Sequence, residues 1–99
     1  MRRGTTPTHT FKVPVDLRNA EVVYMTYKQG DLKVVEKTKE DMEISEDKLE
    51  LTLTQQETLG FSTDDEVEIQ CRARYADGAA IGSKIKKVPV CKVLKEGVI

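Results

Sequence analysis

Apolar and polar residues alternate along several short stretches of the chain, and a period of two predicts β-strands. The longest alternation spans residues 67–75, and another regular one spans residues 48–54. Each has one apolar and one polar face, as expected for a strand with one side packed on a core and the other in water. Further strands are predicted over residues 11–17, 21–29 and 32–37. Pro14 lacks a backbone N–H donor, so the first of these strands is expected to lie at a sheet edge or to be interrupted at this residue.

One short helical turn is predicted between two of the strands. Thr54 and Glu57 have the spacing of a capping box, in which each side chain satisfies a backbone amide at a helix start. Gly60 is expected to end the helix after little more than one turn. A helix near residues 55–60 would therefore serve as a crossover between strands.

The loop formed by Ala76, Asp77 and Gly78 predicts the last hairpin, because it suits a type I turn closed by a left-handed glycine. The pairs that this loop sets opposite each other are Ala73 and Ile81, Cys71 and Ser83, Ile69 and Ile85, Glu68 and Lys86, and Gln70 and Lys84. The apolar positions then shift to Val88 and Val90, which predicts a β-bulge after Lys87.

Six or seven short strands, regular turns and one short helix predict an all-β fold. The expected architecture is an antiparallel immunoglobulin-like β-sandwich, and a small open β-barrel is the alternative. Residues 1–99 are expected to form a single domain, with residues 1–8 as an extended leader and residues 93–99 as a tail. The predicted core consists of Phe11, Val13, Val15, Leu49, Leu51, Leu53, Leu59, Val67, Ile69, Cys71, Ala73 and Ile85.

Charge is close to balanced over the whole chain but very uneven along it. The 99 residues include 16 basic and 17 acidic side chains. Residues 40–69 contain eleven carboxylates and one lysine, whereas both flanking segments are net basic. Oppositely charged faces that meet between copies of a chain have this pattern, and so do strands that lie side by side in one fold. No stretch approaches the roughly 18 consecutive apolar residues of a membrane span, and no signal peptide is expected.

The residues that could carry chemistry are few and scattered. His9 is the only histidine, and we expect it to be a solvated side chain at the start of a strand. Cys71 and Cys91 lack the spacing of a zinc site, and we expect two reduced thiols. The carboxylates of Asp64 and Asp65 lie at a predicted turn without the ligand spacing of a calcium loop. No catalytic residue, metal ligand or cofactor is therefore predicted.

Four basic side chains are predicted to project from one outward face of the last hairpin: Arg72, Arg74, Lys84 and Lys86. Nucleic acid is not the expected ligand, because such surfaces use exposed aromatic rings for stacking and Tyr75 has the inward parity. Two interpretations remain for this face. It could bind an acidic protein surface, such as the 40–69 segment of another copy, or it could be a solvated face with no partner.

Five segments carry a resemblance that runs from end to end: residues 5–11, 23–30, 51–59, 67–72 and 93–99. In these segments the chain resembles a group of small β-sandwich proteins from prophages and mobile elements of gut Firmicutes. The strand order is also similar to that of the N-terminal modules of baseplate upper proteins from phages of Gram-positive bacteria. The resemblance brings no catalytic residues with it.

This resemblance implies a non-enzymatic structural or assembly protein of a phage particle, from its tail or baseplate region, that acts through protein–protein contacts. The expected partners are proteins, including further copies of the chain, with no membrane contact. The expected location is the bacterial cytoplasm during expression, and then the virion. The alternative is a binding module for carbohydrate or another host-surface ligand, although such modules normally present exposed aromatic rings and the chain has only two Phe and three Tyr.

Overall fold

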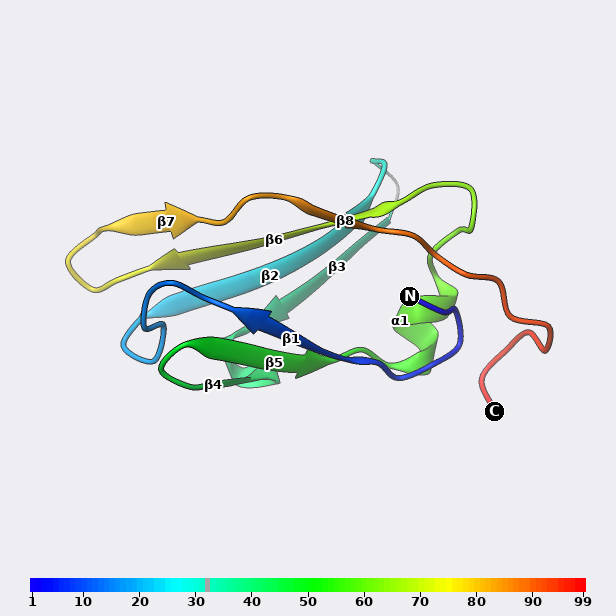
Figure 1. Cartoon of the computed structure of the whole chain (residues 1–99), viewed down its shortest axis with the longest axis horizontal. Coiled ribbons are helices and arrows are strands. Elements are labelled where there is room, and N and C mark those ends of the chain that lie inside the picture. Colours follow the sequence, from blue (N-terminus) through cyan, green and yellow to red (C-terminus); the bar gives the residue numbers. More distant parts are fainter. Residues whose placement is uncertain (32) are drawn as a thin grey trace.

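Two antiparallel β-sheets pack face to face in the computed structural model, which describes residues 1–31 and 33–99. They are visible as separate layers in Figure 1. The predicted all-β sandwich is confirmed. One sheet has the strand order β1 (Thr8–Lys12), β5 (Lys48–Thr52) and β4 (Met42–Ile44). The other has the order β3 (Lys33–Thr38), β2 (Val22–Gln29), β6 (Val67–Arg74) and β7 (Ala80–Gly82), and β8 (Lys86–Val88) also pairs with β6.

The strand order is that of an immunoglobulin-like sandwich without its first strand. In that fold one sheet holds the first, second, fifth and fourth strands in this spatial order, and the other holds the third, sixth and seventh. Here β1, β5 and β4 take the second, fifth and fourth places. β2 and β6 take the third and sixth, β7 and β8 together make an interrupted seventh strand, and β3 is an added edge. Consequently no strand of the described residues lies beside β1 on its outer side.

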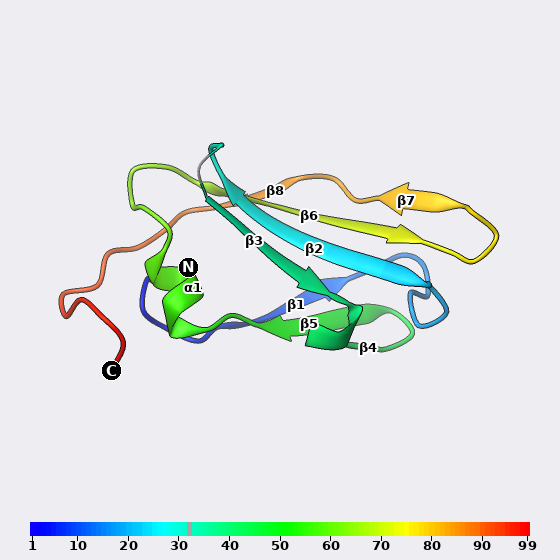
Figure 2. The ribbon, with the colours of Figure 1, turned by 180° about the vertical axis from the view of Figure 1, so that it is seen from behind.

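Two short helical elements carry the chain between the sheets. The 3-10 turn η1 (Lys39–Asp41) leads directly from β3 to β4, as seen from behind in Figure 2. The helix α1 (Gln55–Leu59) leads from β5 to β6. Its capping box is formed as predicted: the Glu57 N–H donates to Thr54 Oγ1 at 3.1 Å, and the Thr54 N–H donates to Glu57 Oε1 at 2.8 Å.

The core between the sheets is mainly aliphatic. Its largest fully buried side chains include Tyr27, Phe61, Leu17, Met25, Leu49, Leu53, Val23 and Val67. Six of the predicted core residues are buried, namely Leu49, Leu51, Leu53, Val67, Ile69 and Ala73. Four others are half-buried, namely Phe11, Val13, Leu59 and Cys71. The prediction is wrong for Val15 and Ile85, which are exposed. Val15 lies beyond the end of β1, where the chain has already left the sheet.

The first hairpin joins β2 to β3 as predicted. Thr26 lies opposite Glu36 in the antiparallel register. Gly30 has a φ of 59°, the left-handed backbone that glycine tolerates in a tight turn. Leu32, the predicted first residue of the return strand, lies outside the described residues.

The tip of the last hairpin has the predicted register. Ala73 lies opposite Ile81, and the Ser83 N–H donates to the Cys71 carbonyl at 2.9 Å. Gly78 has a φ of 91°, as the predicted turn with a glycine bulge requires.

Beyond this tip, β8 is shifted by one residue from the predicted register. Lys86 lies opposite Ile69, in the place predicted for Ile85. The extra residue lies between Ser83 and Lys86, earlier than the bulge predicted after Lys87. Because side chains alternate between the two faces of a sheet, the shift turns Lys86 and Lys87 to the faces opposite those predicted, whereas Val88 keeps its predicted inward position. Ile85 is therefore 53% exposed. Lys86 lies opposite the buried Ile69 and so faces the space between the sheets.

Candidate protein-binding edge

The free edge of β1 exposes a row of backbone hydrogen-bonding groups. Within the described residues β1 pairs with β5 alone, and in an antiparallel pair alternate residues bond to the partner strand. Just past the end of β1, the Val13 N–H donates to the Asp47 carbonyl at 2.8 Å, so the odd-numbered residues face β5. The N–H and C=O groups of Thr8, Thr10 and Lys12 therefore point away from β5, toward the free edge.

The N-terminal residues before β1 bind the end of α1 and the C-terminal segment. Arg2 forms a parallel bridge with Cys91, and the Arg3 N–H donates to the Cys91 carbonyl at 3.1 Å. The Arg3 guanidinium also binds the Phe61 carbonyl at 2.8 Å. The predicted leader is thus fixed to the end of α1 and to the C-terminal segment. Along residues 8–12 the edge has no neighbouring strand in the described part of the chain.

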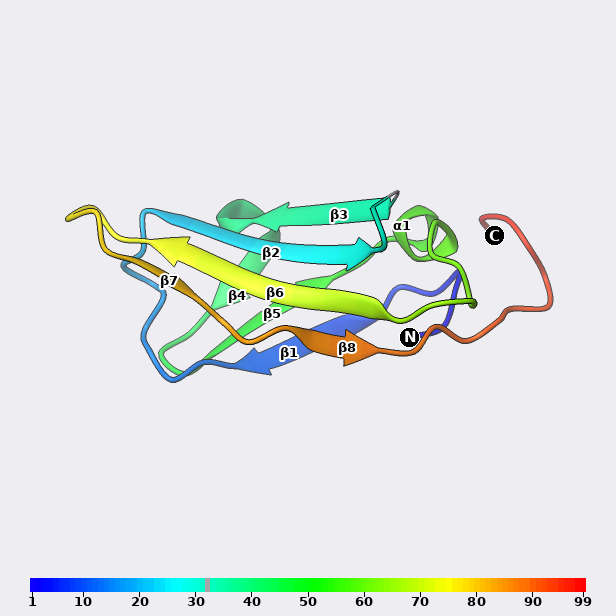
Figure 3. The same cartoon turned by 90° about the horizontal axis from the view of Figure 1, so that it is seen from above.

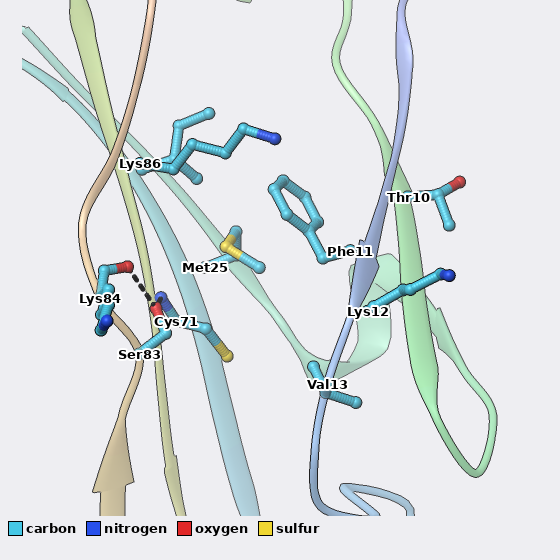
Figure 4. Close-up of a pocket in the computed structure, with 10 residues that line it drawn as sticks. Thr10, Phe11, Lys12, Val13, Met25, Cys71, Ser83, Lys84 and Lys86 are labelled. Atoms are coloured by element: carbon cyan, nitrogen blue, oxygen red, sulfur yellow. Dashed lines mark hydrogen bonds between the residues drawn. The ribbon is translucent and has the colours of Figure 1, made fainter.

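A cleft of about 470 Å³ opens between the free edge of β1 and β8. Both strands lie along the same side of the sandwich, as seen from above in Figure 3. The apolar lining comes from both sheets and consists of Phe11, Val13, Met25 and Ile69, with the thiol of Cys71 beside them (Figure 4). The polar lining consists of Thr10, Lys12, Ser83, Lys84 and Lys86. The cleft lies where the first strand of an immunoglobulin-like sandwich would cover the core.

Three lysines contribute to the lining of the cleft, namely Lys12, Lys84 and Lys86. The side chain of Lys12 points away from the cleft in Figure 4, on the same side of β1 as Thr10. Among residues 1–31 and 33–99, none of the three has a carboxylate within 4 Å. Lys12 lies directly across the β1–β5 pair from Lys48, so its cross-strand neighbour is another cation. Lys86 extends toward Phe11 in Figure 4. The described residues thus leave the positive charges of these three lysines without a neutralising carboxylate.

His9 is held between the sheets, and the expectation of a solvated histidine is wrong. Its Nδ1 lies 2.6 Å from the Tyr27 hydroxyl, and its ring stacks on the Tyr27 ring with centroids 5.6 Å apart. It also meets the Phe11 ring edge-on at 6.1 Å. Burial lowers the pKa of His9, and the positive charges of the N-terminus and Lys86 lower it further. The neutral imidazole is therefore favoured, in a structural position behind the β1 edge.

The four basic residues predicted to share one face lie on two different surfaces. Arg72 and Arg74 project from the outer face of β6, where they border a shallow groove of about 360 Å³ beside Tyr24. Lys84 and Lys86 border the cleft between the sheets instead. Lys86 does so because of the one-residue shift in β8.

Sequence patterns did not single out Thr10 and Lys12 as site residues. A partial signal is present, because Pro14 indicates an edge strand and the alternation that turns Phe11 inward turns Thr10 and Lys12 outward. The pattern contains no information on how close β1 lies to β8. That proximity arises only when the two sheets pack.

No group of three or more metal-ligating side chains lies together in the described part of the chain. Within the same residues, no helix has the length and apolar character needed to cross a bilayer. No protein-family model and no curated protein matches the chain.

Proposed function

We propose that the chain is a non-enzymatic assembly protein that works through protein–protein contacts, by accepting an extended segment of a partner along β1. The observation that carries this proposal is the free edge of β1 beside an apolar cleft. An added strand would pair with the outward N–H and C=O groups, while its alternate side chains fill the cleft. The setting in a phage particle, at its tail or baseplate, rests on the resemblance carried by the sequence.

The length and regular pairing of β1 support its role as an edge that accepts a partner strand. Edge strands that avoid partners are usually very short, or are interrupted by proline or a bulge. β1 pairs with β5 over five consecutive residues without a bulge, and Pro14 stands beyond its end. β7 and β8, on the other side of the cleft, are three residues each and are separated by the shift in register. Of the strands that border the cleft, β1 is therefore the longer and more regular, and it is the one proposed to receive a strand.

Further copies of the chain are among the proposed partners. The tail is strongly exposed, with Leu94 at 91%, Val98 at 65% and Ile99 at 86%. These side chains bury little surface against their own chain, and apolar surface left in water is a common mark of an interaction site. Self-association stays a prediction.

One feature supports the alternative of a carbohydrate-binding module. Tyr24 is 41% exposed on the outer face beside Arg72, and an exposed ring next to polar groups can stack on a sugar. A single ring makes a small platform, so a protein partner remains the proposed function.

The test is complex formation with the proteins encoded beside the gene for this chain. Each is co-expressed with the wild type, with Thr10→Pro and with Tyr24→Ala. Thr10→Pro removes one outward N–H and leaves the bonds to β5 in place. The proposal expects at least one stable complex, weakened at least tenfold by Thr10→Pro and unchanged by Tyr24→Ala. Absence of any complex, or a complex that depends on Tyr24 and not on Thr10, would contradict it.

A further inference from the structure

The floor of the cleft determines which side chains a partner strand can place in it. Phe11, Met25 and Ile69 form this floor, and they offer no hydrogen-bonding side-chain group. A polar side chain directed into this space would lose its water without gaining a hydrogen bond, whereas an apolar one gains from burial. Successive side chains of a strand point to opposite faces. A fitting segment therefore has apolar residues at every second position.

The rim of the cleft determines the charge of the intervening positions. Lys12 stands on the β1 side and Lys84 and Lys86 on the other, and no carboxylate lines the cleft within the described residues. Carboxylates on a partner would meet three cations that form no ion pair within residues 1–31 and 33–99. A basic segment would add like-charge repulsion.

The direction of the added strand follows from the strands beside it. β1 and β8 run in opposite directions (Figure 3), so a strand antiparallel to β1 is parallel to β8. Arg2 already makes a parallel pairing of this kind with Cys91, past the end of β8. A partner strand of this direction would continue the same arrangement along residues 8–12.

Resting on the strand-accepting function above, we propose that the partner segment is an extended acidic peptide, with apolar residues at alternate positions and carboxylates between them. It lies antiparallel to β1. Its apolar side chains cover Phe11 and Met25, and its carboxylates pair with Lys12 and Lys84. The alkyl stem of Lys86 stays against the apolar floor, as long basic side chains do when their charged ends remain in water.

Two synthetic hexapeptides with blocked ends test this proposal. The acidic probe alternates glutamate with valine, and the basic probe alternates lysine with valine. Fluorescence anisotropy of labelled probes, at low and at physiological salt, gives their affinities for the whole chain. The acidic probe is expected to bind at least tenfold more tightly than the basic one, with a preference that falls as salt rises.

Charge reversal at the rim provides the matched comparison. The double variant Lys84→Glu/Lys86→Glu is expected to reverse the preference between the two probes. The control double variant Lys92→Glu/Lys95→Glu makes the same charge change at exposed residues past the end of β8, and it should retain the wild-type preference within threefold. An equal preference shift in both double variants would overturn the proposal, because it would reflect net charge alone.

The outcomes separate the acidic partner from the strand-accepting edge. Suppose that the wild type binds both probes equally and that Thr10→Pro abolishes binding of both. This result would support β1 as the strand-accepting edge and would contradict the proposal that the partner is acidic. If Thr10→Pro bound the acidic probe as tightly as the wild type does, the proposal that β1 accepts a strand would be contradicted. Circular dichroism and the urea midpoint establish that each variant is folded. Thr8→Pro, which removes another outward N–H, replaces Thr10→Pro if that variant is unfolded.

Discussion

The imidazole Nδ1 of His9 lies 2.6 Å from the hydroxyl oxygen of Tyr27, and this hydrogen bond joins the two sheets. His9 lies on β1. Tyr27 lies on β2, which pairs with β6 at the centre of the other sheet. Tyr27 is fully buried, and burial raises its pKa, so the phenol stays protonated. The bond fixes β1 from its inner face while its backbone edge stays open to a partner.

Replacing Tyr27 by Phe should destabilise the protein by about 1–2 kcal/mol, because the half-buried His9 loses its hydrogen-bond partner. Tyr24→Phe, which removes an exposed hydroxyl, should change the free energy of unfolding by less than about 0.5 kcal/mol. Urea unfolding monitored by circular dichroism compares the two variants. Equal effects would mean that the bond between His9 and Tyr27 contributes nothing to stability.

Stability should fall as the pH is lowered from 7 to 5. The pKa of His9 is lowered in the folded state from an ordinary value near 6.5. Between these two pKa values the unfolded chain binds more protons, so stability rises with pH in this window and is lost as the pH falls through 6.5 toward the folded pKa. Glu57 does not contribute between pH 7 and 5, because its pKa is lowered in the folded protein from an ordinary value of 4.5 and it therefore titrates at lower pH.

His9→Gln is the matched variant for this pH dependence. Urea midpoints at pH 7, 6 and 5 should decline less steeply in His9→Gln than in the wild type. The same slope in both proteins would show that other groups cause the decline.

Leu51→Ala should cost about 2–5 kcal/mol, since Leu51 is 3% exposed at the centre of the smaller sheet. Ile85→Ala should cost less than about 0.5 kcal/mol, because the shift in β8 places Ile85 on the surface. The pair of denaturant midpoints thus tests the observed register directly. A large loss of stability in Ile85→Ala would contradict the observed register and support the one expected from the sequence, in which Ile85 lies opposite Ile69.

The two cysteines should react at different rates. Cys91 is exposed, whereas Cys71 is half-buried in the cleft and burial raises the pKa of its thiol. Less of Cys71 is therefore present as the reactive thiolate. A chromogenic thiol reagent should modify Cys91 first in the native protein and both thiols after unfolding without reductant, and Cys71→Ser identifies the slow phase. Fewer than two thiols in the unfolded wild type would contradict the assignment.

The sequence was most informative where one pattern set both local structure and burial. Strict alternation placed Val67, Ile69 and Ala73 in the core, and the loop ending at Gly78 determined the register at the hairpin tip. The spacing between Thr54 and Glu57 predicted the start of α1. In each case the controlling interactions are local, or repeat with the period of the strand.

Sequence reasoning failed where tertiary packing made the choice. Nothing in the local sequence distinguishes a bulge before Lys86 from one after Lys87, because either leaves an apolar residue in the ladder. The burial of His9 depends on Tyr27, which is 18 residues away on the other sheet. For the same reason the cleft between β1 and β8 could not be predicted, although each of its lysines is visible in the sequence.

Amide hydrogen exchange along β1, followed by NMR with and without the acidic hexapeptide, tests the central claim most directly. In the free protein the amides of Phe11 and Val13, which face β5, should exchange slowly, while those of Thr8, Thr10 and Lys12 should exchange rapidly. Saturating peptide should slow the second group and leave the first unchanged. Slow exchange at Thr10 and Lys12 in the free protein, or rapid exchange there in the saturated complex, would contradict the assignment of β1 as the edge that receives a partner strand.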